Sequence, residues 1–243
     1  MIETMPLIEL RSIRLEPPAE GSERLFDVLS PDEQERARRF VTETLRTRYV
    51  VARATLRVLL GARVERDPQS LVFDYGHAGK PSLRDHDDVA FNLSHSGSLA
   101  VYAFAEDDLS LGIDVEEIRA MHDLHGIARR FFAPAEAATL AALPEALQTD
   151  AFFACWTRKE AYLKARGDGI AAALDRFEVT LRPDQEPALV HIDGDADAAA
   201  QWSAHAFVPA AGFVAALVHR GEARHGDCES LTADDVSRML SRS

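Results

Sequence analysis

The feature that most constrains the fold of this chain is a pattern of elements that occurs twice. An alternating apolar stretch, typical of a strand, lies at residues 7–15 and again at 111–116. Each stretch is followed by an Arg-Arg-Phe sequence and then by a long helical segment. Each copy ends in two β-rich runs, which are residues 89–93 with 99–104 and residues 202–208 with 213–219. The sequence therefore predicts two similar halves.

The repeat also predicts how the chain divides. We expect an α+β fold of two similar α/β halves, each an antiparallel sheet packed on helices, over residues 1–108 and 109–222. Within the long helices, the segment from Arg53 to Arg57 matches the segment from Glu160 to Lys164. Residues 223–243 are predicted to form a polar C-terminal tail that ends in a short helix. The junction of two halves is a natural place for a ligand.

The composition excludes several classes of protein. The 47% hydrophobic content is typical of a globular chain, and no apolar run approaches the ~20 residues that span a membrane. The N-terminus lacks the basic and apolar regions of a signal peptide. Two cysteines form no disulfide framework. We therefore expect a reduced, cytoplasmic protein that does not bind a membrane.

The charge of the chain is acidic overall but uneven. A net charge of −13 argues against nucleic acid as a partner. Between Arg36 and Arg66, however, nine arginines accompany only two acidic residues. Two explanations stay open for this segment, which are ordinary solvated helix charges and an anion-binding surface.

Two carboxylates share one face of a predicted strand. In residues 112–118, strand alternation places Asp114 and Glu116 on the face opposite Ile113 and Val115. Neighbouring acids on a strand face repel each other unless solvent or a cation separates them. A solvent-facing edge and a cation site are both consistent with this segment.

A third carboxylate, Glu160, lies on the apolar stripe of a predicted helix, between Trp156 and Leu163. An inward acid is costly unless it is paired or bound to metal, and Lys164 one turn later is a possible partner. Three hard oxygen ligands without a His or Cys cluster favour Mg²⁺, which also binds the phosphates of a substrate. The chain has only three lysines among 27 basic residues, and they are Lys80, Lys159 and Lys164.

Other polar segments are candidates for anion binding. Ser94 and His95 lie where a predicted strand reaches a turn, and Lys80 lies in a glycine-containing loop. Arg48 and Arg53 belong to the long helix of the first half. Each of these residues also has a plain interpretation as part of a turn, a loop or a solvated helix face.

Taken together, these segments resemble the 4′-phosphopantetheinyl transferases of the Sfp type. The resemblance runs from about Arg36 to Ile170 and rests on four segments in the family's order, namely residues 79–81, 91–96, 112–116 and 156–164. It implies two α/β halves related by pseudo-twofold symmetry. It also implies an enzyme that transfers 4′-phosphopantetheine from coenzyme A to a serine of an apo acyl, peptidyl or aryl carrier protein, releasing 3′,5′-ADP.

The resemblance implies a role for individual residues. Mg²⁺ would be held by Asp114, Glu116 and Glu160, with strand alternation favouring Glu116 over Glu117. The coenzyme A phosphates would be contacted by Arg48, Arg53, Lys80, Ser94, His95, Lys159 and Lys164. The catalytic residues would be Glu160, as the base that takes the serine proton, and Lys164, as the group that stabilises the leaving phosphate. Glu116 and a metal-bound water remain alternative bases.

Three other functions stay open from the sequence. They are a Mg²⁺-dependent phosphohydrolase of nucleotide diphosphates, a coenzyme A-binding regulator without chemistry, and a purely structural protein. Fatty acid, polyketide and nonribosomal peptide carriers are all possible partners of a transferase. We expect a monomer, because two fused halves are sufficient to form one site.

Overall fold

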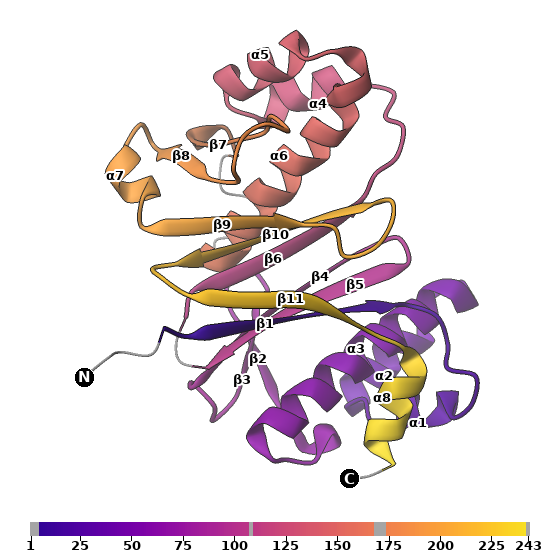
Figure 1. Ribbon diagram of the computed structural model, residues 1–243. Helices are drawn as coiled ribbons and strands as arrows, with labels where there is room; N and C mark the ends of the chain where they lie inside the picture. Colours follow the sequence, from indigo (N-terminus) through magenta and orange to yellow (C-terminus); the bar gives the residue numbers. More distant parts are fainter. Residues whose placement is uncertain (1–4, 107–108, 168–173, 242–243) are drawn as a thin grey trace.

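Two sheets packed face to face form the centre of the molecule, and helices cover the outer face of each (Figure 1). The computed structural model describes residues 5–106, 109–167 and 174–241. The elements of the first half are β1 (Leu7–Arg14), α1 (Ser22–Asp27), α2 (Pro31–Arg38), α3 (Glu43–Val64), the 3₁₀ helix η1 (Pro68–Ser70), β2 (Phe73–Tyr75), β3 (Pro81–Leu83), β4 (Val89–Ser96) and β5 (Leu99–Glu106).

The second half repeats this order of elements with one additional helix, α7. It contains β6 (Leu111–Glu117), α4 (Leu124–Phe131), α5 (Pro134–Ala142), α6 (Glu145–Arg166), the 3₁₀ helix η2 (Leu174–Arg176), β7 (Phe177–Val179), β8 (Leu189–Ile192), α7 (Ala196–Ala199), β9 (Trp202–Phe207) and β10 (Phe213–Arg220). The chain ends with β11 (Arg224–Leu231) and α8 (Ala233–Leu240).

The strand order confirms the predicted repeat. The first sheet has the order β11-β1-β5-β4 and the second has the order β6-β10-β9. If β11 is left aside, each sheet has three antiparallel strands. In both sheets, the strand that comes last in the sequence (β5 or β10) lies in the centre, between the first (β1 or β6) and the second (β4 or β9). Each half also has a two-stranded ribbon, β2-β3 or β7-β8. The α+β fold of two similar halves is therefore confirmed.

Alternation along the strands builds three layers of core. On β5, Val101 and Ala103 face the other sheet, whereas Tyr102 and Phe104 pack under the helices of the first half. On β6, Ile113 faces the other sheet in the same way. Because both sheets are covered on both faces, their central strands are almost continuously apolar.

The C-terminal residues do not form a separate tail. The strand β11 pairs with β1 in parallel, and α8 packs against α3 and α1. The predicted short helix is present, and its N-cap is Thr232, whose hydroxyl accepts a hydrogen bond from the N–H of Asp235 at 3.1 Å. In the described part of the chain, no helix combines the length and hydropathy needed to cross a bilayer.

The long helix α6 lies unusually close to β6. A Cβ atom added to Gly112 of β6 would lie 2.2 Å from the carbonyl oxygen of Ala161 and 2.3 Å from the backbone nitrogen of Ala165. Both atoms belong to the backbone of α6, so a side chain at Gly112 has no room to move into. Glycine at this position allows the helix and the strand to approach within a distance that alanine excludes.

The substitution Gly112→Ala is therefore expected to destabilise the protein. Overpacking of this kind costs about 1–3 kcal/mol, and each kcal/mol lowers the Tm of a chain of this size by about 2–4 °C. Thermal unfolding followed by circular dichroism measures the change. Gly226→Ala is the control, because a Cβ at this exposed position meets no atom within 4 Å; equal Tm values for both variants would contradict the close approach.

Three histidines, one each from β9, β10 and β11, lie close together. The Nε2 atoms of His205 and His219 are 3.2 Å apart, and the ring of His205 lies 4.3 Å from the ring of His225. Burial lowers the pKa of His205 to about 4, and the neighbouring His225 and His219 contribute to this shift. The folded protein therefore keeps His205 neutral at a pH where the unfolded chain protonates it.

This shift predicts a loss of stability in acid. A histidine whose pKa is lowered on folding contributes fully above its unfolded pKa of about 6.5, and its contribution disappears as the pH falls towards 4. Because His205 is only partly buried, we expect a loss of about 1–3 kcal/mol over this range. Urea unfolding at several pH values should show a smaller loss for His205→Gln than for the parent or for the exposed control His77→Gln. A difference between His205→Gln and the parent that does not vary with pH would contradict the prediction.

Candidate functional site

The two halves meet along the edge strands β4 and β6, which are joined by side chains. The Oδ1 atom of Asn92 accepts a hydrogen bond from the N–H of Ile113 at 2.9 Å. Ser94 Oγ donates to Asp114 Oδ1 at 2.7 Å. Two residues further along β4, Ser96 Oγ donates to Glu116 Oε2 at 2.7 Å. Alternate residues of β4 in the first half therefore bind β6 of the second half.

Asp114 is the centre of a buried polar cluster. Lys164 of α6 donates to Asp114 Oδ1 at 2.6 Å and to Ser94 Oγ at 2.8 Å. Asp114 is only 5% exposed, whereas the side chain of Lys164 is 29% exposed. Burial raises the pKa of Asp114, and its partners Lys164 and Ser94 only partly offset that effect. The structure places Ser94, Asp114 and Lys164, three of the candidate residues from the sequence, in contact with one another.

Glu160 lies one turn before Lys164 and faces the same cluster. Burial, and then the charge of Asp114, raise the pKa of Glu160 to about 7, with Glu116 adding to the shift and Lys164 opposing it. Two carboxylate oxygens, Oδ2 of Asp114 and Oε1 of Glu160, are buried without a hydrogen-bond partner among the described residues. Such oxygens are costly in a folded protein unless another group satisfies them.

Glu116 connects this cluster to an apolar hollow. Its Oε2 atom also lies 3.4 Å from Nη1 of Arg119, and its side chain is 22% exposed. The hollow beside it has a volume of about 200 Å³. Its lining consists of Glu116, Arg119, Met121, Ile127, Phe152, Phe153 and Trp156.

The carboxylates have the donor chemistry of a Mg²⁺ site but not its finished geometry. Among residues 5–106, 109–167 and 174–241, no group of three or more His, Cys, Asp or Glu side chains is arranged to hold a metal ion. In the structure, the ammonium group of Lys164 binds Asp114, while Ser96 and Arg119 bind Glu116. The two unsatisfied oxygens of Asp114 and Glu160 nevertheless fit a hard cation, since Mg²⁺ prefers carboxylate ligands.

Two predicted anion-binding residues lie near this cluster. His95 is exposed on β4, and desolvation of its ring, followed by the charges of Lys164 and Arg36, lowers the pKa of His95. Lys80, in the loop between β2 and β3, donates to the carbonyls of Leu111 at 2.8 Å and Ala165 at 3.3 Å. Lys80 therefore links the ribbon of the first half to the ends of β6 and α6.

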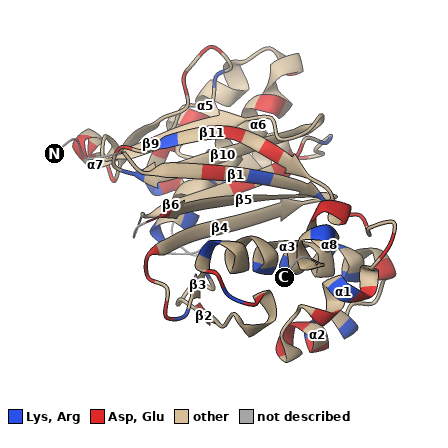
Figure 2. Cartoon of the chain, turned by 60° about the horizontal axis from the view of Figure 1, so that its bottom comes forward, with Lys and Arg blue, Asp and Glu red and all other residues tan. Residues whose placement is uncertain are grey.

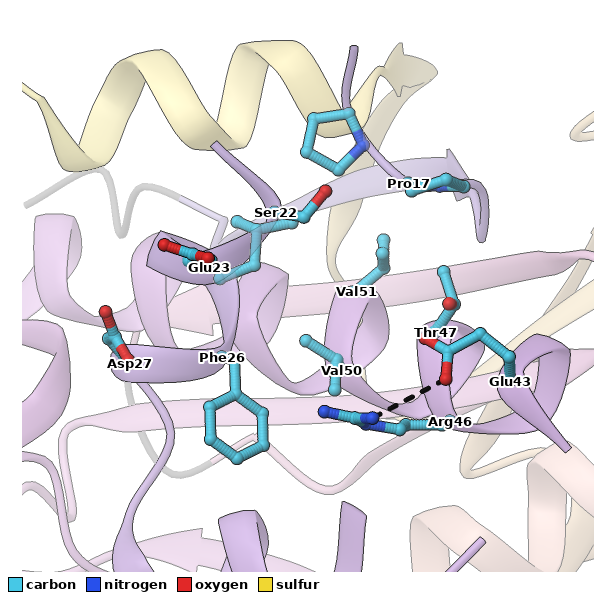
Figure 3. Close-up of a pocket in the computed structure, with 12 residues that line it drawn as sticks. Pro17, Ser22, Glu23, Phe26, Asp27, Glu43, Arg46, Thr47, Val50 and Val51 are labelled. Carbon is cyan, nitrogen blue, oxygen red and sulfur yellow. Dashed lines mark hydrogen bonds and ion pairs between the residues drawn. The ribbon is translucent and has the colours of Figure 1, made fainter. Parts of the chain in front are cut away.

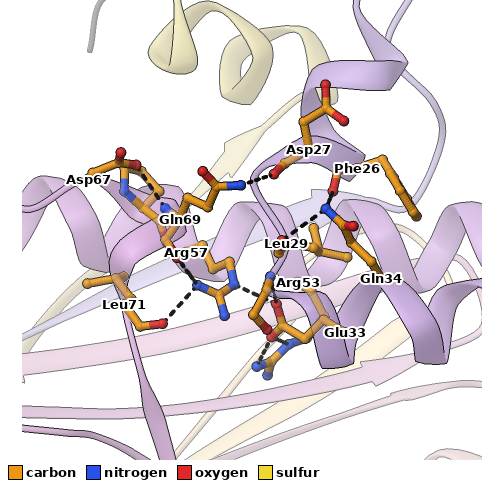
Figure 4. Close-up of polar contacts among 12 residues, drawn as sticks. Phe26, Asp27, Leu29, Glu33, Gln34, Arg53, Arg57, Asp67, Gln69 and Leu71 are labelled. Atoms are coloured by element: carbon orange, nitrogen blue, oxygen red, sulfur yellow. Dashed lines mark hydrogen bonds and ion pairs between the residues drawn. The ribbon is translucent and has the colours of Figure 1, made fainter.

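The arginines of α3 are less available than the sequence suggests. Arg53 donates through Nε to Glu33 Oε1 at 2.6 Å, and its side chain is 11% exposed (Figure 4). Arg63 pairs with Glu9 in the same manner. The short helices α1 and α2 beside α3 carry both acidic and basic residues (Figure 2), whereas α3 itself has five arginines and one acid. Much of the positive excess counted in this segment is therefore paired with acids from outside it. Arg48 is half-buried and has no hydrogen bond or ion pair with a described residue.

The prediction that Lys159 contacts a phosphate is wrong. Lys159 is 1% exposed and forms an ion pair with Glu136 at 2.8 Å. Its ammonium group also donates to the carbonyls of Leu174 at 2.8 Å and Phe177 at 2.6 Å. It therefore points into the second half, away from Glu160 and Lys164, because successive helical residues project about 100° apart.

Sequence reasoning missed three residues that act on the cluster, whereas Ser96 had been considered beside Ser94 as a phosphate contact. The three are Arg36, Asn92 and Arg119. The period of two in Asn92, Ser94 and Ser96 was a usable signal, since alternate residues of a strand share a face. Arg36 and Arg119 have no such signal, because only the fold brings them near His95 and Glu116.

A second cavity lies elsewhere in the first half (Figure 3). Its volume is about 450 Å³, and it lies between the loop after β1, α1 and α3. Apolar residues such as Phe26 and Val50 line it together with Arg46, which pairs with Glu43. None of its twelve lining residues belongs to the predicted site.

Comparison with known proteins identifies the family. Residues 15–107 match the family described as "4′-phosphopantetheinyl transferase, N-terminal", and residues 110–218 match the 4′-phosphopantetheinyl transferase superfamily. The chain is 40% identical to the 4′-phosphopantetheinyl transferase HetI of a Nostoc species over 217 residues, which cover 88% of each protein. It is 33% identical to the transferase Sfp of Bacillus subtilis over 165 residues, or 68% of this chain and 72% of Sfp.

A solved structure of holo-[acyl-carrier-protein] synthase from Thermotoga maritima aligns with 47% of this chain and 64% of that one, with a TM-score of 0.35 and 25% identity. The two family matches and the relatives agree with the resemblance read from the motifs. The chain belongs to the 4′-phosphopantetheinyl transferase superfamily, and it is an enzyme that transfers 4′-phosphopantetheine from coenzyme A to carrier proteins.

Proposed function

We propose that the buried cluster of Asp114, Glu160 and Lys164 is the catalytic centre of this transfer and that it works with Mg²⁺. The observation that carries the proposal is the pair of unsatisfied carboxylate oxygens on Asp114 and Glu160, next to an ammonium group. Asp114, Glu116 and Glu160 would hold the cation. When bound, it supplies positive charge that offsets the charge of the pyrophosphate.

The coenzyme A phosphates are proposed to bind beside this cluster. The residues proposed for this role are Arg48, Arg53, Lys80, Ser94, His95 and Lys164. Lys164 and Ser94 each donate a hydrogen bond to Asp114 Oδ1. His95 follows Ser94 and lies on the exposed side of β4. Such donors are typical phosphate contacts. Lys159 is excluded from this set by its burial.

The reaction needs a base because a serine hydroxyl is a weak nucleophile at neutral pH. Glu160 takes the proton of the carrier serine in our proposal, since its raised pKa of about 7 suits a general base. The serine oxygen then forms a bond to phosphorus, and the phosphorus–oxygen bond to the adenosine phosphate breaks. Lys164 stabilises the leaving 3′,5′-ADP through its ammonium group.

We further propose that the enzyme acts as a monomer in the cytoplasm on acyl or peptidyl carrier proteins of secondary metabolism. Both halves of one chain supply residues to the cluster, which supports a complete site in a single copy. Cys155 and Cys228 are free thiols, which supports a reducing compartment.

The metal requirement is tested by the intact mass of an apo carrier protein after incubation with enzyme, coenzyme A and Mg²⁺. We expect a mass gain of one phosphopantetheine that is lost with EDTA and restored by excess Mg²⁺. For Asp114→Asn, the half-saturating Mg²⁺ concentration should rise by at least about 10–100-fold, the range that even outer ligand partners control. Glu117→Gln is the matched control for the neighbouring carboxylate, because its side chain lies outside the cluster.

A mass gain of equal rate in EDTA would exclude the metal from the reaction. An Asp114→Asn variant with the Mg²⁺ dependence of the parent would exclude Asp114 as a ligand, even if the metal itself is required.

The assignment of the base predicts that Glu160→Gln reduces the rate of transfer severely. Because general-base catalysis contributes about 10²–10⁴-fold, kcat should fall by this factor, while isothermal titration should show coenzyme A still bound. Glu145→Gln, on the exposed first turn of the same helix, is the control. If Glu160→Gln retained the parent's kcat, the proton would have to go to another group, with Glu116 as the alternative.

A further inference from the structure

Two buried ion pairs occupy corresponding places in the two halves. In the first half, Glu33 of α2 pairs with Arg57 of α3, with 2.5 Å between Oε2 and Nε. In the second half, Glu136 of α5 pairs with Lys159 of α6, with 2.8 Å between Oε2 and Nζ. The side chains of all four residues are at most 3% exposed. We call these the first and the second ion pair.

The carboxylates of the two pairs have the same local bonds. Glu33 and Glu136 each occupy the third position of a short helix that begins with proline. Their Oε2 atoms accept a hydrogen bond from the backbone N–H of the residue before that proline, namely Ser30 at 3.1 Å and Ala133 at 2.8 Å. The same oxygen therefore caps a helix and binds the buried cation in both halves.

The cations also reach corresponding acceptors. Arg57 Nη1 donates to the carbonyl of Pro68, the first residue of η1, at 2.9 Å, and to that of Leu71, the residue after η1, at 3.1 Å. Lys159 Nζ donates to the carbonyls at the same two positions around η2, which are Leu174 and Phe177. Each pair thus fixes a short helix, a long helix and the start of a ribbon relative to one another.

A neighbouring contact confirms this register. Thr55 Oγ1 donates to the carbonyl of Val51 at 2.7 Å, and Thr157 Oγ1 donates to that of Phe153 at 2.9 Å. Thr55 corresponds to Thr157 as Arg57 corresponds to Lys159. The two ion pairs therefore belong to the fold that both halves share. The first ion pair occurs although α3, unlike α6, carries no carboxylate that we assign to catalysis.

The two pairs hold different functional groups. In the first pair, the second oxygen of Glu33 binds Arg53, and the ribbon held through Leu71 leads to the loop with Lys80 (Figure 4). In the second pair, Lys159 directly precedes Glu160 on α6. A buried ion pair is weak evidence for stability, since its desolvation offsets its attraction, whereas it does restrict the arrangement of the elements it joins.

We propose that the two ion pairs are separate positioning devices, the first for coenzyme A binding and the second for the chemical step. The first sets Arg53 and the Lys80 ribbon, and the second sets the direction of Glu160. Neither pair touches the reacting atoms. This inference rests on the proposed roles of Arg53 and Glu160.

The experiment replaces each pair by neutral side chains of similar shape and compares kcat with the Kd for coenzyme A. The variants are Glu33→Gln with Arg57→Met, and Glu136→Gln with Lys159→Met, in which glutamine retains the helix cap. Misplacement of a catalytic group by a fraction of an ångström costs about tenfold or more. The second variant should therefore lose at least about tenfold in kcat while its Kd for coenzyme A stays within about threefold. The first should show a Kd raised about tenfold, with kcat at saturating coenzyme A reduced less than about threefold.

Conservative changes provide a second test that does not depend on losing a buried charge. Because arginine fills the cation position in the first half, Lys159→Arg should recover most of the kcat that Lys159→Met loses. Arg57→Lys should likewise recover coenzyme A affinity relative to Arg57→Met. If the neutral variants do not fold, the arginine and lysine variants decide the question: the loss that remains should fall on kcat alone for Lys159→Arg and on the Kd for coenzyme A alone for Arg57→Lys.

The proposal is overturned if both pairs change kcat and Kd in the same proportion, or if activity only follows the folded fraction measured by circular dichroism. Direct variants separate this outcome from a failure of the proposed site. Should Arg53→Met leave the Kd unchanged, or Glu160→Gln leave kcat unchanged, the assigned role of that residue is wrong. Should these two variants behave as expected while the ion-pair variants do not, only the positioning inference fails.

Discussion

The arrangement of the buried cluster of Asp114, Glu160 and Lys164 depends on the close contact between β6 and α6 at Gly112. This contact sets the separation between the strand that carries Asp114 and Glu116 and the helix that carries Glu160 and Lys164. With this spacing, Lys164 reaches both Asp114 and Ser94 with hydrogen bonds shorter than 3 Å. The close approach of the two backbones helps to bury Asp114 and Glu160, and this burial raises the pKa of both carboxyl groups.

The two halves share a frame but do not share a function. In the register set by Arg57 and Lys159, the residue that corresponds to Glu160 is Val58, and the residue that corresponds to Lys164 is Ala62. Val58 is part of the apolar core of the first half. The first half instead contributes Ser94 and Ser96 across the seam to the strand of the second half. The polar cluster thus combines residues from two similar units, and each unit supplies a different part of it.

Local patterns predicted much of this structure. Strand alternation correctly separated Asp114 from Ile113, and the paired β-rich runs correctly indicated the hairpins β4–β5 and β9–β10. The family and its reaction also followed from the motifs, although the assignment of single residues to metal and coenzyme A remains a proposal. These successes share a cause, which is that each depends on a period or a spacing within one segment.

Contacts between distant segments were harder to predict. The sequence comparison aligned Arg57 of the first half with Lys164 of the second, and this alignment was wrong. The buried ion pairs show that the residue of the second half that corresponds to Arg57 is Lys159. The spacing of the basic residues on α3 and α6 does not show which of them faces the buried glutamate of the short helix before it, Glu33 on α2 or Glu136 on α5. For the same reason, the sequence overestimated the free positive charge of α3, whose partners Glu33 and Glu9 lie outside the counted segment.

The parallel pairing of β11 with β1 has a consequence for how the chain reaches this fold. Its first strand can complete its hydrogen bonds only after the last strand has been synthesised, because Leu7 lies opposite Arg224. The second half lies entirely between these two strands in the sequence and can form its own core first. Until then, one edge of the first sheet stays open to pairing with other chains. Completion of the last strand closes this edge, so a chain released before β11 carries an exposed strand into the cell.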